Sequence, residues 1–211
     1  MKSTNTRLLH KRSKIIHLKV KRMKNIAILA SGTGTNAENI IKYFKGSDTV
    51  NVAFVLVDNP MAQARERAKN LGIPTYIRMR HEFKEPTLIL PLLDLYHIDL
   101  VVLAGSLVFL PEYLTARYDH RIINIHPSLL PKYGGKGFYG HKVHEAAIAS
   151  GDKESGITIH YINNEYDSGD IIFQATCPIL SDDTPDTLAS RVHALEYQHF
   201  PHVIEEVVAT I

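Results

Sequence analysis

Apolar and polar positions alternate in blocks from residue 24 onward, with short apolar runs separated by longer amphipathic stretches. This pattern is typical of βαβ units that build a parallel sheet. The apolar runs predict strands at Ile26–Ala30, Val50–Val57, Thr75–Ile77, Leu100–Ala104 and Ile122–Ile125. Apolar residues at helical spacing predict the intervening helices, at Asn36–Phe44, Pro60–Leu71 and Pro86–Tyr96, and Pro91 kinks the third helix or delays its start.

The character of the chain changes after Ile125. A Pro- and Gly-rich stretch, HPSLLPKYGGKGFYG, predicts a long loop, and loops of this length in compact domains are usually functional. We then expect a helix at His141–Ser150, strands at Gly156–Ile162 and Asp170–Leu180, and a closing helix from about Thr184. The predicted fold class is therefore α/β, a doubly wound, mostly parallel sheet with a C-terminal antiparallel portion, in a single domain over residues 23–211.

Composition narrows the class of protein. With 211 residues, of which 45% are hydrophobic and 22% charged, the chain suits one fairly large domain with a buried core. No apolar stretch approaches the ~20 residues of a membrane span, because Gly105 and Ser106 break the longest run and Pro111 closes it. A single cysteine, Cys177, excludes an internal disulfide and favours a reducing cytoplasm.

The net charge of +2 hides a strong asymmetry, because residues 1–24 carry nine Lys or Arg and no acid, which leaves about −7 for residues 25–211. A nucleic-acid-binding arm is one interpretation of this basic segment. A secretory signal is disfavoured, since no uninterrupted apolar region or small-residue cleavage site follows the charges. We favour a third interpretation, in which Met23 is the natural start. We therefore expect residues 1–22 to be disordered and dispensable.

A glycine turn, SGTGTN, follows the first predicted strand. Read as G-T-G-T-N-A it satisfies the dinucleotide-binding pattern G-x-G-x-x-[GA], and Asp58 ends the second strand about where that pattern places an acid for a ribose hydroxyl. The hydroxyls and amide of Ser31, Thr33, Thr35 and Asn36 suit a single terminal phosphate at a helix N-terminus equally well. From these residues alone the two ligands, and a merely structural turn, remain open.

Two further stretches carry candidate chemistry. Asn124 and His126 alternate on a short strand, so their side chains point to one side, and Pro127 ends the strand there. Asp167 lies in the segment NNEYDSGDII, which by itself is typical of a plain hairpin turn. If the Asp167 carboxylate lies beside an imidazole, the pair suits proton transfer. A metal site is disfavoured, because His141 and His144 share a helical spacing with no third ligand in the pattern.

Ligands of open parallel sheets bind at the carboxyl ends of the strands, where the strand order reverses. That rule gathers SGTGTN, AGSLVFLP and NIHPS on one rim of the predicted sheet. Over residues 24–205 the chain resembles the phosphoribosylglycinamide formyltransferase family of folate-dependent enzymes. The resemblance lies in the order and spacing of four segments: SGTGTN, NIHPSLLPKY, SGI…H…DSGDII and RVHALEY…P. The resemblance implies a Rossmann-like formyltransferase fold.

It also implies transfer of a formyl group from 10-formyltetrahydrofolate to the primary amine of glycinamide ribonucleotide, with no metal. Asn124, His126 and Asp167 would be catalytic. Gly34, Thr35 and Asn36 would hold the substrate phosphate and Glu196 its ribose. The folate pocket would be lined by Leu107, Val108, Phe109, Leu110, Asn124, Asn163 and Asp167. Both partners would be small molecules, with no nucleic acid or membrane, and the enzyme would be a cytoplasmic monomer or homodimer.

Two departures from the family pattern concern the co-substrate. The segment Arg78–His97 is shorter than in the family, so the arginine that usually contacts the folate has only Arg78, Arg80 and Lys84 as candidates. The loop YGGKGFYGH is longer and richer in glycine. The alternatives are a formyltransferase acting on an amino sugar nucleotide and a non-catalytic dinucleotide-binding module that uses Asp58.

Overall fold

The computed structural model describes residues 22–211, so the prediction of a disordered tail lies almost entirely outside the described residues. The strands are β1 (Lys24–Ala30), β2 (Val50–Val57), β3 (Thr75–Ile77), β4 (Ile98–Leu103), β5 (Ile122–His126), β6 (Glu154–Tyr161) and β7 (Ile171–Pro178). The helices are α1 (Thr35–Tyr43), α2 (Gln63–Asn70), the 3₁₀ helix η1 (Arg80–Lys84), α3 (Pro86–Leu95), α4 (Glu112–Arg117), α5 (His141–Ala149) and α6 (Pro185–Thr210).

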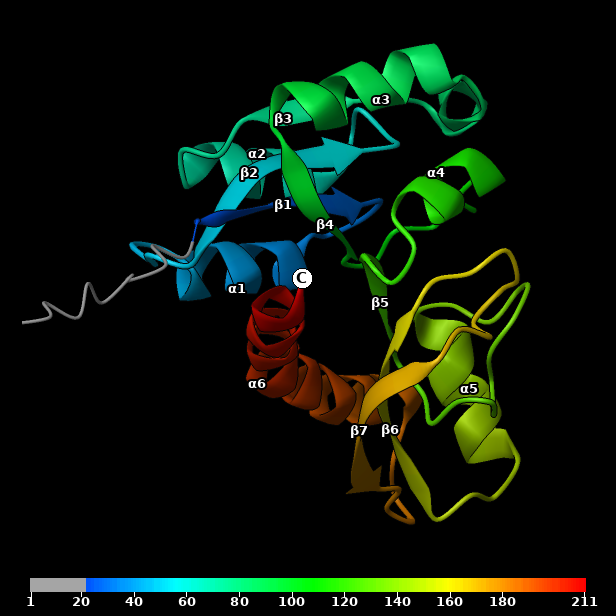
Figure 1. Cartoon of the computed structure of the whole chain (residues 1–211). Helices are drawn as coiled ribbons and strands as arrows, with labels where there is room; N and C mark the ends of the chain where they lie inside the picture. The colour runs from blue at the N-terminus through cyan, green and yellow to red at the C-terminus, as the bar shows by residue number, and fades with distance from the viewer. Residues whose placement is uncertain (1–21) are drawn as a thin grey trace, which may run out of the picture.

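All seven strands form one sheet in the order β3-β2-β1-β4-β5-β6-β7 (Figure 1). The first five are parallel, β6 pairs antiparallel with β5, and β7 pairs antiparallel with β6. The predicted fold class is thus confirmed. Since β1 lies between β2 and β4, the strand order reverses at β1, and the ends of β1 and β4 form the switch point.

Alternate residues of the central strands enter two cores, one on each face of the sheet. In β1, Ile26 and Ile28 pack with apolar residues of α1, α2, α5 and α6, whereas Ala27 and Leu29 pack with those of η1, α3 and α4. The long helix α6 packs against α1 and also against β6 and β7, so it ties the two halves of the sheet together (Figure 1).

Several boundaries differ from the sequence prediction. The second helix begins at Gln63 rather than Pro60, because the Asn59 side chain accepts the N–H of Met61 and holds residues 59–62 in a turn. Pro91 lies inside α3 and does not delay its start, since Pro86 occupies a first-turn position where no N–H is needed. The short elements η1 and α4 were not predicted. No helix within residues 22–211 has the length and apolarity to cross a membrane.

Candidate active site

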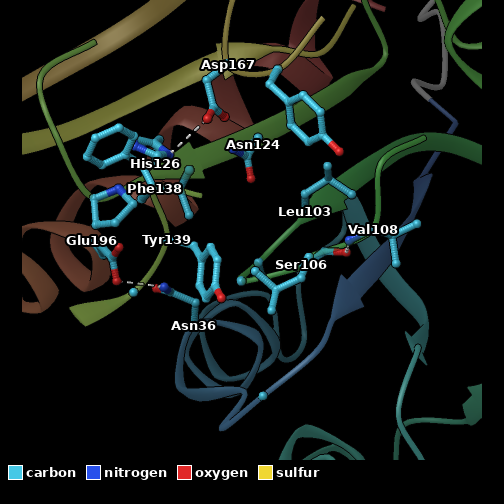
Figure 2. A pocket seen from close by; sticks show the side chains of 18 of the residues that line it. Asn36, Leu103, Ser106, Val108, Asn124, His126, Phe138, Tyr139, Asp167 and Glu196 are labelled. Carbon is cyan, nitrogen blue, oxygen red and sulfur yellow. Dashed lines mark hydrogen bonds and ion pairs between the residues drawn. The ribbon is translucent and has the colours of Figure 1, made fainter. Parts of the chain in front are cut away.

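A cavity of about 670 Å³ opens at the carboxyl ends of β1, β4 and β5. It is lined by all of the residues to which the family resemblance assigns a substrate, co-substrate or catalytic role: Gly34, Thr35, Asn36, Leu107, Val108, Phe109, Leu110, Asn124, His126, Asn163, Asp167 and Glu196. Figure 2 shows several of them converging from separate elements on the same space. The rule for open parallel sheets therefore places the cavity correctly.

One end of the cavity is the N-terminus of α1. Gly34 is its N-cap residue and has φ +75°, in the left-handed region that favours glycine. A Cβ at Gly34 would lie 2.3 Å from the Cα of Ala64, so the turn packs against α2 more closely than any side chain allows. The first N–H groups of a helix lack intrahelical partners and carry the positive end of its dipole. This end of the cavity therefore suits an anion.

Asn36 and Glu196 form a buried polar contact beside that helix terminus. The Asn36 Nδ2 donates to Glu196 Oε2 at 2.8 Å, and the same oxygen lies 2.8 Å from Nδ1 of His193 (Figure 2 draws the Asn36–Glu196 bond). Glu196 is only 4% exposed, and its hydrogen bond raises the pKa of His193 above its usual value. Among residues 22–211 the buried Oδ1 of Asn36 has no hydrogen-bond partner, so it is an acceptor that a bound ligand would satisfy.

His126 and Asp167 face each other across the opposite part of the cavity. Nδ1 of the buried His126 lies 3.6 Å from Asp167 Oδ2, and its Nε2 donates to the carbonyl of Tyr133 at 2.7 Å. Asp167 Oδ2 also accepts the N–H of Gly135 at 2.8 Å. The Nε2 of His126 thus has a backbone acceptor, and its Nδ1 faces a carboxylate oxygen.

A second histidine, His160, joins this group and was not predicted. It is the cross-strand partner of Asn124, so the two side chains share one face of the sheet. Asn124 Nδ2 donates to His160 Nε2 at 3.1 Å, and Nδ1 of His160 donates to the Tyr161 carbonyl at 2.9 Å. Burial lowers the pKa of His160, so it is a neutral acceptor that orients Asn124. Its Nε2 lies 3.7 Å from Asp167 Oδ1, so the carboxylate lies between two imidazoles.

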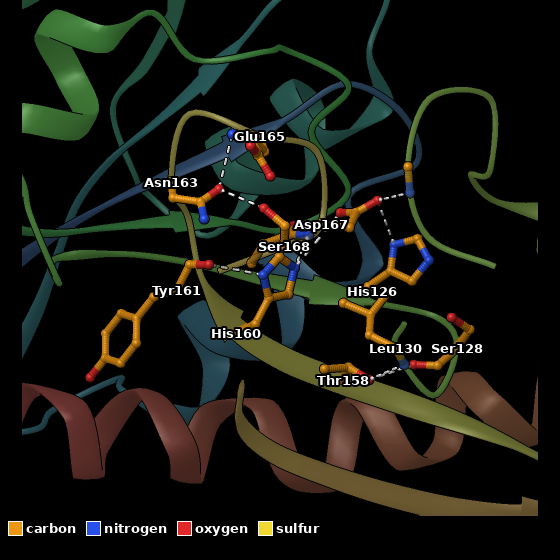
Figure 3. Close-up of polar contacts among 12 residues, drawn as sticks. His126, Ser128, Leu130, Thr158, His160, Tyr161, Asn163, Glu165, Asp167 and Ser168 are labelled. Carbon is orange, nitrogen blue, oxygen red and sulfur yellow. Dashed lines mark hydrogen bonds and ion pairs between the residues drawn. The ribbon is translucent and has the colours of Figure 1, made fainter. Parts of the chain in front are cut away.

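The turn that carries Asp167 is built by local hydrogen bonds (Figure 3). Asn163 Oδ1 accepts from the N–H of Glu165 at 2.9 Å and from the hydroxyl of Ser168 at 3.0 Å. A Cβ at Gly169 would lie 1.9 Å from the carbonyl oxygen of Tyr161, so only glycine fits there. Asp167 itself has φ +49°, a conformation that non-glycine residues rarely adopt, so this turn holds the carboxylate in a specific place.

The wall between the two ends is the segment after β4. Ser31 Oγ accepts the N–H of Leu107 at 2.8 Å, and the N–H of Ser31 donates to the Gly105 carbonyl at 3.1 Å. These bonds join the turns after β1 and β4. Leu107 and Phe109 are exposed in the cavity and Val108 is buried, so the segment offers an apolar wall with backbone polar groups.

The position of the Asp58 side chain does not fit the role that the dinucleotide interpretation gives it. Its side chain is 1% exposed and pairs with Arg80, whose Nε lies 2.6 Å from Oδ2. Asp58 does not line the cavity, whereas Arg80 does. Of the three basic candidates for the folate contact, Arg80 is thus the one at the cavity. Arg78 instead donates to backbone carbonyls of Ile77 and Leu88.

His144 also lines the cavity, on α5. Burial lowers the pKa of His144 to about 4, so the side chain is neutral near neutral pH. Its buried Nδ1 has no hydrogen-bond partner in the part of the chain that the structure describes. His141, predicted as its neighbour in a weak metal pattern, instead lies near Glu145 and Asp186, which raise the pKa of His141. Within residues 22–211, no three His, Cys, Asp or Glu side chains are grouped to hold a metal ion.

Comparisons with known proteins place this geometry in a family. The model of the formyl transferase family matches residues 24–204. A phosphoribosylglycinamide formyltransferase of Vigna unguiculata, named chloroplastic, is 39% identical over 189 residues, which cover 87% of this chain and 61% of that protein. One of Haemophilus influenzae is 38% identical over 188 residues, with 87% and 86% coverage.

Solved structures agree with this assignment. The crystal structure of the phosphoribosylglycinamide formyltransferase from Anaplasma phagocytophilum superposes with a TM-score of 0.81 at 36% identity, covering 89% of this chain and 88% of that one. The chain spans less than two thirds of the length of the two plant relatives, at 61% and 65%. The identity and coverage, together with the match to the family model, show that the chain belongs to the formyl transferase family.

Proposed function

We propose that the protein transfers the formyl group of 10-formyltetrahydrofolate to the primary amine of glycinamide ribonucleotide in purine synthesis. The products are formylglycinamide ribonucleotide and tetrahydrofolate. The observation that carries the proposal is the convergence in one cavity of His126, Asp167 and the N-terminus of α1. The names of the relatives, phosphoribosylglycinamide formyltransferases from plants and bacteria, support the same substrate pair.

The substrate phosphate binds at the turn formed by Gly34, Thr35 and Asn36, where backbone N–H groups and the helix dipole favour an anion. The neighbouring carboxylate of Glu196 accepts from the ribose hydroxyls. Its existing bond to Asn36 supports this placement, because it fixes the carboxylate 2.8 Å from a residue of the phosphate turn. The unpartnered Oδ1 of Asn36 offers one further acceptor to the same ligand.

At the other end, the amine nitrogen attacks the formyl carbon, which builds a tetrahedral oxyanion. Asn124 and a protonated His126 donate hydrogen bonds to that oxygen, and such preorganised donors are typically worth 10²–10³ in rate. Because Nε2 of His126 already donates to Tyr133, Nδ1 is the nitrogen that faces the reacting groups. Asp167 stabilises the imidazolium and accepts the proton shed by the amine, directly or through water. Cleavage of the bond from the formyl carbon to N10 then releases tetrahydrofolate, and N10 takes up a proton.

The folate ring system lies along Leu107–Leu110 and the turn from Asn163 to Asp167, where backbone groups flank apolar side chains. Arg80 takes the place of the family arginine and faces the anionic tail. Its fixed ion pair with Asp58 supports this role, since the pair holds the guanidinium at the cavity. No metal is proposed.

An amino sugar nucleotide as acceptor remains the alternative substrate, since it would use the same three catalytic residues. The names of the relatives favour glycinamide ribonucleotide over the sugar nucleotide. The dinucleotide-binding module has no support, because Asp58 is buried and paired with Arg80. We further propose one domain over residues 23–211. A cytoplasmic location stays a prediction, and the plant relatives are named chloroplastic.

A formyl-transfer assay tests the proposal. The purified full chain is mixed with 10-formyltetrahydrofolate and either glycinamide ribonucleotide or an amino sugar nucleotide, and the release of tetrahydrofolate is followed. Transfer to glycinamide ribonucleotide alone is expected. Transfer only to the sugar nucleotide, or to neither, would reject it. A chain that begins at Met23 serves as a second sample and tests whether the basic segment is dispensable.

A further inference from the structure

Three polar side chains on one face of α1 contact α6. Asn36, Asn39 and Tyr43 follow the i, i+3, i+7 spacing of a single helix face. Asn36 donates to the carboxylate of Glu196, and Tyr43 makes exposed side-chain contacts further along the two helices. Between them, Asn39 Nδ2 donates to the backbone carbonyl of Tyr197 at 2.9 Å. Of these three side chains, Asn39 therefore holds the main chain of α6, whereas the other two hold side chains.

The carbonyl of Tyr197 needs this partner because of a proline. In a regular α-helix the carbonyl of residue 197 accepts the N–H of residue 201, but Pro201 lies inside α6 and has no N–H. A proline inside a helix also bends it, and Figure 1 shows α6 changing direction along its length. The amide of Asn39 thus takes the place of the missing donor at the bend of α6.

This bend lies next to the residue that the proposed function assigns to the ribose. Glu196 immediately precedes Tyr197, and Asn36, which donates to Glu196 Oε2 at 2.8 Å, lies one turn before Asn39. Two consecutive residues of α6 are thus bound by two successive turns of α1. The helix α1 also begins at the turn proposed to hold the substrate phosphate. The position of α6 along α1 therefore sets the distance from the phosphate turn to the Glu196 carboxylate.

A contact to the main chain fixes this distance more firmly than the Asn36–Glu196 bond does. Both side chains of that bond rotate about their own torsions, and both belong to the groups that a bound substrate would contact. The Asn39 bond acts on the backbone of α6 instead. Because Asn39 is not among the residues that line the cavity, its amide keeps this bond while a substrate binds and leaves.

We propose that Asn39 is a positioning residue for the acceptor substrate, an inference that rests on the proposed function. By holding the Tyr197 carbonyl at the Pro201 bend, Asn39 sets the separation between the phosphate turn and the ribose-binding carboxylate of Glu196. A substrate that carries both a phosphate and a ribose benefits from this fixed separation, because the two groups of the protein need no rearrangement on binding. A lone phosphate contacts only the turn and does not depend on it.

Substitution of Asn39 tests the proposal. Asn39→Ala removes the amide and introduces the residue with the highest helix propensity, so α1 is retained. The KM for glycinamide ribonucleotide should rise about three- to tenfold, the range expected for the loss of one hydrogen bond. The kcat and the KM for 10-formyltetrahydrofolate should stay near wild type, because His126 and Asp167 lie on other elements. Tyr43→Phe removes another contact between α1 and α6 and is the matched control, with all constants unchanged.

Inorganic phosphate separates positioning from a merely structural role. Used as a competitive inhibitor against glycinamide ribonucleotide, phosphate binds only at the N-terminal turn of α1. Its inhibition constant should therefore be the same in Asn39→Ala and in the wild-type protein, while the KM for glycinamide ribonucleotide differs. A structural role alone would lower the Tm and would change the two affinities together or leave both as they are.

The outcomes distinguish the two proposals. No formyl transfer by the wild-type protein to either acceptor would reject the proposed function. Transfer by the wild-type protein, together with an unchanged KM for glycinamide ribonucleotide in Asn39→Ala, would reject only the role of Asn39. An equal loss of affinity for phosphate and for the substrate would also reject that role, since Asn39 would then support the phosphate turn itself.

Discussion

Gly34→Ala should destabilise the protein by about 2–5 kcal/mol. One part of the cost is conformational, because Gly34 has φ +75° and an L-residue in the left-handed region costs about 1–2 kcal/mol. The other part is steric, because the new Cβ would lie 2.3 Å from the Cα of Ala64 and 2.4 Å from its Cβ. Overlap of this kind in a packed interior costs about 1–3 kcal/mol. Since Ala64 belongs to α2, the strain must move one helix against the other.

Thermal or urea unfolding measures the effect, and Gly32→Ala is the matched control. For a domain of this size, each 1 kcal/mol shifts the Tm by about 2–4 °C, so Gly34→Ala should lower it by roughly 4–20 °C. A Cβ at Gly32 meets nothing within 4 Å and its φ is not left-handed, so the control should change little. The KM for glycinamide ribonucleotide should also rise in Gly34→Ala alone. Equal stability of the two variants would refute this account of the turn.

Three other variants have distinct expected signatures. His126→Ala should lower kcat by about 10²–10³ with little change in KM, because the hydrogen bond of the His126 side chain strengthens as the oxyanion forms. Steady-state kinetics measure both constants, and a change in KM alone would contradict this role. Thr35→Val combined with Asn36→Ala should mainly raise the KM for glycinamide ribonucleotide, and an unchanged KM would mean that the phosphate binds elsewhere. His144→Gln should flatten the pH dependence of stability. Because burial lowers the pKa of His144 from 6.5 to about 4, the unfolded chain takes up a proton between these values that the folded chain does not. The free energy of unfolding should therefore fall by about 1.4 kcal/mol per pH unit as the pH drops from 6.5 towards 4, for about 3 kcal/mol in all. Urea titrations at pH 7 and pH 5 check this, and the idea fails if the variant keeps the full slope.

Local patterning determined much of this protein's fold. The sequence pattern predicted all seven strands. The apolar runs were clearest for β1, β2, β4 and β5, because these parallel strands are largely buried and read as continuous apolar segments. The alternation of Asn124 and His126 put both on one face, and the sheet rule put three distant stretches on one rim. The apolar pattern gave the wrong helix start where a short-range hydrogen bond sets the boundary of the helix, as at Asn59 before α2.

Tertiary structure decided which polar side chains meet. The sequence could not pair His160 with Asn124, because that contact depends on the antiparallel register of β5 and β6. Nor could it show that Asn36 binds Glu196, 160 residues further along the chain. The glycine turn alone was compatible with a dinucleotide or a phosphate, and only packing shows that Asp58 is buried against Arg80. Periodicity reports the environment of a residue relative to its own strand or helix. The approach of two such elements depends on how their buried faces pack, and that is a property of the whole chain.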